Sequence, residues 1–135
     1  MSATPASRLP VTIALVLVVA YAALIFGGSS REAPEAITDL EIPDFLLHMV
    51  EYGGLGFLLS RWLRLWTGRT DLRTLVLIPA VLGTLYGITD EIHQGFVPER
   101  DGSPMDVAAD ALGAALGAAA YFVPVLIRGR RSPSA

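Results

Sequence analysis

The chain has 135 residues, of which 53% are hydrophobic and 17% charged, and its net charge is −3. Soluble domains usually carry about 25% charged residues, and a nucleic-acid-binding protein needs a basic surface, so we expect a membrane protein with no nucleic-acid partner. The absence of Cys and Lys excludes disulfides, zinc–thiolate sites, a cysteine nucleophile and a P-loop or Schiff-base lysine.

Long apolar blocks predict an all-α integral membrane bundle of four transmembrane helices. A helix rises about 1.5 Å per residue, so about 20 residues cross a hydrocarbon core of about 30 Å. The four spans form one membrane domain over residues 9–127, between an N-terminal segment, 1–8, and a basic tail, 128–135. The expected spans are 9–28, 45–66, 72–96 and 104–127.

The first span is uncharged and follows Arg8, so a signal peptide is an alternative interpretation. Its apolar run is long for the hydrophobic region of a signal peptide, and GGSSREA is a mediocre cleavage site, which favours a permanent helix.

The second span is less apolar than the first. Polar residues at its start share one helical face, namely Asp44, His48, Glu51 and Tyr52.

The third span carries a polar stripe near its end, with Glu91 about 100° around the helix from Asp90. The fourth span begins with Asp106 and Asp110 on one face. Two simpler interpretations apply: Asp106, like Asp44, could be a helix N-cap, and glycines four residues apart are typical of close helix packing. These glycine pairs are Gly83/Gly87 and Gly113/Gly117, and the stripe of the third span is Tyr86, Asp90, His93 and Gln94.

Arginine is distributed unevenly along the chain. Of the ten arginines, only Arg31 and Arg100 lie outside the N-terminal segment, the region between the second and third spans and the tail. The positive-inside rule then places both termini in the cytoplasm and the loops 29–43 and 97–103 outside. Every Asp and Glu except Asp71 lies on the outer side or in the outer half of a span. Acidic residues contribute little to membrane topology, so the gathering of Asp and Glu on the outer side indicates a functional site there.

An ionisable group at membrane depth costs roughly 2.5–3.5 kcal/mol on insertion scales, so it normally faces the bundle interior and has a partner. Several such groups at one depth on three helices predict a polar pocket open to the outside. The adjacent carboxylates Asp90 and Glu91 inside the third span are hard to explain by a contribution to the stability of the fold. The pocket residues expected from the pattern are Asp44, His48, Glu51, Tyr52, Asp90, Glu91, Gln94, Asp106 and Asp110, with Asp90, Glu91 and His48 as catalytic candidates.

The segment YGITDEIHQGFVPERDGSPMDVAADALGAALG resembles the signature of VanZ-like membrane proteins: DExxQ, an aromatic residue, a Pro-x-Arg turn, an Asp and a helix rich in small residues. PDFLLHMVEYGGLGFLL is similar to the family's other motif, with Asp, His and Tyr at four-residue intervals followed by Leu-Gly. The resemblance covers roughly residues 40–125. It implies functional polar positions at Asp44, His48, Tyr52, Asp90, Glu91, Gln94, Arg100 and Asp106.

Two positions depart from the family pattern. Phe45 stands where the family often has Lys, and Asp110 where it commonly has Asn. Both changes make the pocket more acidic, which favours a cation or a positively charged headgroup. Alternatively, a protonated Asp110 would donate a hydrogen bond as Asn does.

The resemblance implies a protein of the cell (plasma) membrane and a link to resistance against glycopeptide antibiotics, teicoplanin in particular, but it identifies no reaction and no cofactor.

The first hypothesis for the function is a pocket that binds membrane lipids, with a lipid headgroup or a cell-wall precursor as its ligand. The second is a metal-dependent enzyme acting on such a headgroup, although the spacing of its His and carboxylates matches no known metal motif. The third is proton or cation conduction. Gly- and Ala-rich helix faces also allow an oligomer.

Overall fold

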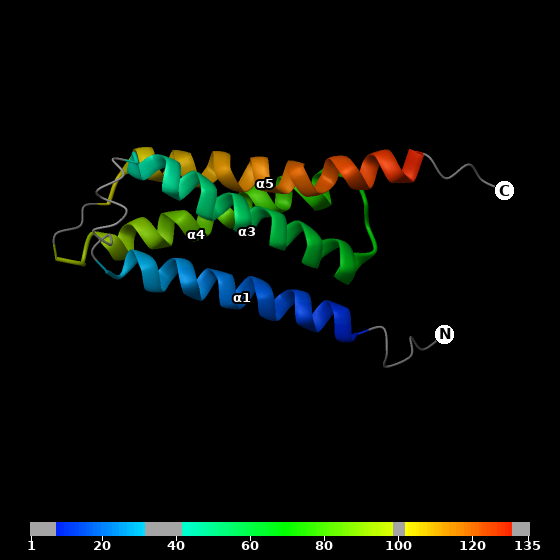
Figure 1. Ribbon diagram of the computed structural model, residues 1–135, viewed down its shortest axis with the longest axis horizontal. Helices are drawn as coiled ribbons and strands as arrows, with labels where there is room; N and C mark the ends of the chain where they lie inside the picture. The colour runs from blue at the N-terminus through cyan, green and yellow to red at the C-terminus, as the bar shows by residue number, and fades with distance from the viewer. Residues whose placement is uncertain (1–7, 32–41, 99–101, 131–135) are drawn as a thin grey trace.

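The computed structural model describes residues 8–31, 42–98 and 102–130, which form a bundle of four helices (Figure 1). No strand occurs in these three segments, so the all-α prediction is confirmed. A short π-helical segment, η2, leads directly into the third long helix. The elements are α1 (Leu9–Ser29), α3 (Asp44–Thr67), η2 (Arg73–Leu77), α4 (Ile78–Gln94) and α5 (Pro104–Arg130).

Three segments are long and apolar enough to cross a membrane, namely Leu9–Ser29, Arg73–Gln94 and Pro104–Gly129. The helix α3 has 24 residues but does not meet this apolar criterion, because it carries Glu51, Arg61 and Arg64 together with His48. It is the central helix, in contact with α1, α4, η2 and α5. Its neighbours therefore shield much of its surface, and we treat it as the second of the four spans of the bundle.

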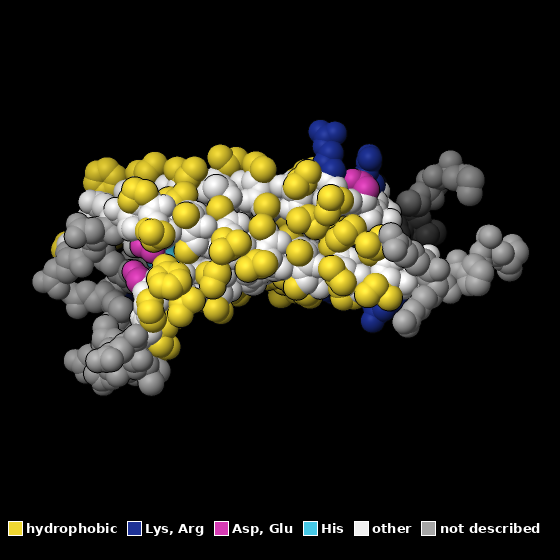
Figure 2. All heavy atoms as spheres, turned by 90° about the horizontal axis from the view of Figure 1, so that it is seen from above, with side chains coloured by type: hydrophobic (Ala, Val, Ile, Leu, Met, Phe, Trp, Pro, Cys, Tyr) yellow, Lys and Arg dark blue, Asp and Glu magenta, His cyan; other side chains and the backbone are white. Residues whose placement is uncertain are grey.

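The surface is that of a protein surrounded by lipid. Large hydrophobic side chains are exposed on the outer faces of the helices, among them Val16, Leu24, Val81 and Ile92. Figure 2 shows them along the whole bundle, with arginines near one end and acidic side chains and a histidine visible at the other. The start of α1 and the end of α5 lie at the arginine-rich end (Figure 1). Which end faces the cytoplasm stays a prediction from the arginines.

The helices α3 and α5 pack backbone against backbone. A Cβ atom added at Gly117 would overlap the carbonyl of Gly53, and one added at Gly113 would overlap the carbonyl of Met49. Close packing is therefore the role of the Gly113/Gly117 pair, as its spacing predicts. These glycines face another helix of the same chain, and an oligomer through Gly- and Ala-rich helix faces stays a prediction.

The turn between α3 and η2 is closed by Asp71. Its carboxylate accepts hydrogen bonds from Arg69 Nε at 3.0 Å and from the backbone N–H and the hydroxyl of Thr74, both at 3.0 Å. The bond from Arg69, and next the backbone bond from Thr74, lower the pKa of Asp71 to about 2. The carboxylate is thus ionised at neutral pH and caps the start of the η2–α4 span at the arginine-rich end.

Candidate functional site

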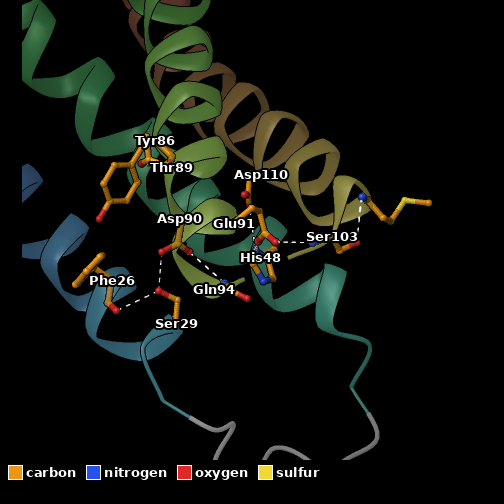
Figure 3. Close-up of polar contacts among 11 residues, drawn as sticks. Phe26, Ser29, His48, Tyr86, Thr89, Asp90, Glu91, Gln94, Ser103 and Asp110 are labelled. Atoms are coloured by element: carbon orange, nitrogen blue, oxygen red, sulfur yellow. Dashed lines mark hydrogen bonds and ion pairs between the residues drawn. The ribbon is translucent and has the colours of Figure 1, made fainter. Parts of the chain in front are cut away.

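The predicted polar residues gather at the end of the bundle opposite the arginine-rich end, where α4 ends and α3 and α5 begin (Figure 3). Two of them, Asp44 and Glu51, are exposed. Arg100 lies outside the described residues. The others are all buried, namely His48, Tyr52, Asp90, Glu91, Gln94, Asp106 and Asp110.

Three of the buried groups, one from each of three helices, form what we call the His48 cluster: His48 of α3, Glu91 of α4 and Asp110 of α5. Nδ1 of His48 lies 3.0 Å from Oδ1 of Asp110 and 3.6 Å from Oε1 of Glu91. Figure 3 shows the three side chains converging between the helices. The cluster brings together one imidazole and two carboxylates that are far apart in the sequence.

Neighbouring groups hold the cluster in place. Oε2 of Glu91 accepts the backbone N–H of Ser103 at 2.7 Å, and the Ser103 hydroxyl accepts the N–H of Met105 at 3.2 Å, so Ser103 caps α5. The carboxylate of Asp110 packs on Gly87, where an added Cβ would overlap it. One turn after His48, the ring of Tyr52 lies nearly parallel to the imidazole. Glu91 thus links the end of α4 to the start of α5.

Asp90 is adjacent to Glu91 in the sequence but points to a different helix. Its Oδ1 accepts a hydrogen bond from the hydroxyl of Ser29 in α1 at 2.6 Å, and its Oδ2 accepts one from Gln94 at 3.3 Å (Figure 3). Successive residues of a helix point about 100° apart. The adjacent carboxylates therefore serve two separate polar sets rather than one pocket.

The rest of the polar stripe of α4 also contacts α1. The Tyr86 hydroxyl donates to the carbonyl of Ala22 at 2.7 Å. The ring of His93 stacks on Phe26, with centroids 4.4 Å apart, and its Nε2 lies 3.0 Å from the hydroxyl of Ser30. We call these contacts, with the Ser29–Asp90 bond, the α1–α4 seam. They pack α1 against α4, and the permanence of the first span stays a prediction from the sequence.

Asp44 and Asp106 lie near the cluster on the side of the helix starts. Ligand atoms of Asp44, His48 and Asp106 fall within 4.8 Å of one another, so His48 belongs to two such groups. The N-cap interpretation of these two aspartates is wrong. The cap residue of α3 is Pro43, with Asp44 inside the helix, and the side chain that caps α5 is that of Ser103.

Three buried polar atoms in the described part of the chain have no hydrogen-bond partner: Oη of Tyr52, Oε1 of Glu91 and Oδ2 of Asp110. Two of them belong to the His48 cluster, and the third belongs to the ring beside it. An unsatisfied buried polar group costs about 1–3 kcal/mol. Such groups gathered at one place call for a partner, and a bound water, ion or ligand would each supply one.

A cavity of about 360 Å³, wide open to the surface of the bundle, lies beside Glu91 between α4 and α5. The apolar part of its wall is formed by Ile88, Ile92 and Val107. The rest of the lining is formed by Glu91 and by Gly102, Ser103 and Pro104 at the start of α5. The cavity thus joins a lipid-facing apolar surface to a carboxylate of the His48 cluster.

Sequence reasoning missed Ser29 and Ser103, which fix the two adjacent carboxylates of α4. Ser103 directly precedes a proline at the start of a helix, which is a recognisable N-cap signal. No local pattern marks Ser29, because its partner lies 61 residues away in the chain.

The VanZ/LLP1 family matches residues 12–127, a range that holds the His48 cluster and most of all four helices. No curated protein and no solved structure matches the chain. The match covers much more than half of the sequence and agrees with the motifs in the second, third and fourth spans. The chain belongs to the VanZ/LLP1 family.

Proposed function

We propose that the chain is a multi-pass protein of the cell membrane whose polar site faces outward and binds the headgroup of a lipid or of a lipid-anchored cell-wall precursor. The link of VanZ-like proteins to glycopeptide resistance supports this location, because these antibiotics meet wall precursors at the outer surface of that membrane. The arginines at the opposite end of the bundle support the same orientation.

The observation that carries this proposal is the cavity beside Glu91. Its apolar wall of Ile88, Ile92 and Val107 suits an acyl or prenyl chain, and Glu91 lies where a headgroup would reach the buried cluster. Ligand sites commonly combine a mostly apolar lining with a few placed polar groups. Carboxylates and an imidazole accept hydrogen bonds from hydroxyl and ammonium groups, which are frequent in such headgroups.

The test is complementation in a strain that lacks this protein, with glycopeptide sensitivity and the membrane lipid profile as readouts. Two substitutions act on the site in different ways: Glu91→Gln removes a charge, and Ile92→Trp fills the cavity from its apolar wall. We expect both to return the cells to the phenotype of the strain without the protein, at unchanged protein level. Leu85→Trp is the matched control, because Leu85 is exposed on the same helix and does not line the cavity.

Two results would contradict the proposed headgroup site. If Glu91→Gln and Ile92→Trp both complement fully, the site has no role in the phenotype and the proposal is wrong. If Leu85→Trp fails as completely as Ile92→Trp, the effect is one of bulk on the lipid-facing surface and the cavity is not the cause.

A metal-dependent enzyme acting on the same headgroup is the second candidate. It is favoured by the His48 cluster, whose three ligand atoms all lie within 4.8 Å of one another. A metal ion can polarise a phosphoryl or carbonyl oxygen or activate a water molecule. This candidate requires a metal ion in the His48 cluster, and binding of an ion does not depend on which reaction follows.

A further inference from the structure

We propose that the His48 cluster binds one divalent first-row metal ion, Zn²⁺ or Mn²⁺, through Nδ1 of His48, Oε1 of Glu91 and a carboxylate oxygen of Asp110. This inference deepens the proposed function and rests on the same site, because the ion would lie between the cavity and the buried end of the polar cluster. Three protein ligands leave a coordination position for an oxygen atom of a bound headgroup.

The spacing of the three ligand atoms suits an ion. Metal–nitrogen and metal–oxygen distances of about 2.0–2.2 Å place neighbouring ligands about 3.0 Å apart at right angles and about 3.4 Å apart in a tetrahedron. Nδ1 of His48 lies 3.0 Å from Asp110 Oδ1 and 3.6 Å from Glu91 Oε1. The first distance matches neighbouring ligands of one ion, and the second exceeds the tetrahedral value by about 0.2 Å, so small side-chain movements would bring all three atoms to a shared ion.

The unpartnered atoms are a second observation, independent of the spacing. Glu91 is 6% exposed and Asp110 is fully buried, yet Oε1 of the first and Oδ2 of the second accept no hydrogen bond. The other oxygen of Glu91 is held by the N–H of Ser103, which leaves Oε1 directed at His48. Partners of this kind fix the orientation of metal ligands.

The hydroxyl of Tyr52 fits the same arrangement. Tyr52 is fully buried beside His48, and its Oη has no hydrogen-bond partner although it lies in the field of Asp90, Asp110 and Glu91. A phenol donor among carboxylates normally finds an acceptor. An oxygen ligand on the ion would supply one.

Charge balance also favours a divalent ion. Two buried carboxylates need two positive charges, and the imidazole of His48 supplies at most one. One nitrogen and several oxygens form the donor set that suits Zn²⁺ and Mn²⁺, whereas Ca²⁺ takes six to eight oxygen ligands. The chain has no Cys, so thiolate coordination does not compete.

The experiment uses the full chain purified in detergent, stripped with a chelator and then titrated with Zn²⁺ or Mn²⁺ alone. We expect one ion per chain by elemental analysis and a rise of the unfolding temperature with ion concentration, as mass action requires. Glu91→Gln and Asp110→Asn keep the shape of the side chains. They should weaken binding by about 100-fold or more, since even outer-shell changes cost about 10–100-fold.

Two control variants keep the test specific. His93→Ala removes the only other histidine, which lies in the α1–α4 seam, and Asp71→Asn removes a carboxylate at the far end of the bundle. Both should retain one ion per chain. The proposal is overturned if the wild-type chain binds no ion, or if His93→Ala loses binding while Asp110→Asn keeps it.

The outcome for the ion and the outcome for the proposed function can be told apart. If the ion binds and Glu91→Gln removes it without any effect on complementation, the ion site stands and the proposed function fails. If Glu91→Gln and Ile92→Trp abolish complementation but the wild-type chain binds no ion, the function stands and the ion site is wrong.

Discussion

Replacing His48 by alanine is expected to destabilise the metal-free bundle by about 3–5 kcal/mol, the usual cost of removing one partner from a buried ion pair. The substitution leaves the buried carboxylates of Glu91 and Asp110 close together without the imidazole that contacts both of them. The free energy of unfolding of the purified chain, measured by denaturant titration in one detergent, gives this value directly. Adding Asp110→Asn to His48→Ala should restore part of the loss, because one of the two unpaired charges is then gone.

His93→Ala provides the comparison for this prediction. His93 is partly buried, and its loss removes one hydrogen bond to Ser30 and a stacking contact with Phe26. A net hydrogen bond contributes about 0.5–1.5 kcal/mol. If His48→Ala destabilises the chain no more than His93→Ala does, the His48 cluster is not the buried charged centre described above.

The second large effect is expected at the contact of α3 with α5. Gly117→Ala should lower the free energy of unfolding by about 1–3 kcal/mol, the usual cost of overpacking. The added methyl group would overlap the backbone of Gly53, so α3 and α5 would have to move apart. Thermal unfolding of the purified chain measures the change.

Gly28→Ala in α1 is the matched control for this substitution. It adds the same methyl group to a helical glycine, but nothing lies within 4 Å of the new atom. Alanine favours a helix over glycine by up to about 1 kcal/mol, so this variant should unfold at the same or a higher temperature than the wild type. Equal effects of the two substitutions would argue against direct backbone contact between α3 and α5.

Three of the four spans were predictable from the sequence because each is an apolar block of membrane-spanning length. The helix α3 shows how this signal weakens in a central helix. Its neighbours shield its polar side chains, so α3 is less apolar than α1, α4 or α5 and can still lie in the bundle.

Most residues of the candidate site could be predicted from the sequence. Their separation into the His48 cluster and the α1–α4 seam could not. Helical spacing placed His48 and Tyr52 on one buried face, and it identified Asp110 as buried in the fourth span. It also assigned Glu51 to the pocket, whereas the structure leaves that side chain exposed, since it lies about 60° around the helix from His48. The separation of Asp90 from Glu91 depends on where α1 packs, which no pattern within one helix can specify.

The proposed function requires the end of the bundle with the His48 cluster to face outward, and the chain is well suited to a direct test because it contains no cysteine. Single cysteines at Pro98, exposed just after α4, and at Thr70, exposed in the turn after α3, mark the two ends. A membrane-impermeant maleimide is applied to intact cells and then to permeabilised cells. If the His48 cluster faces outward, Pro98→Cys reacts in intact cells and Thr70→Cys only after permeabilisation. The reverse pattern would place the site on the cytoplasmic side and overturn the proposed function.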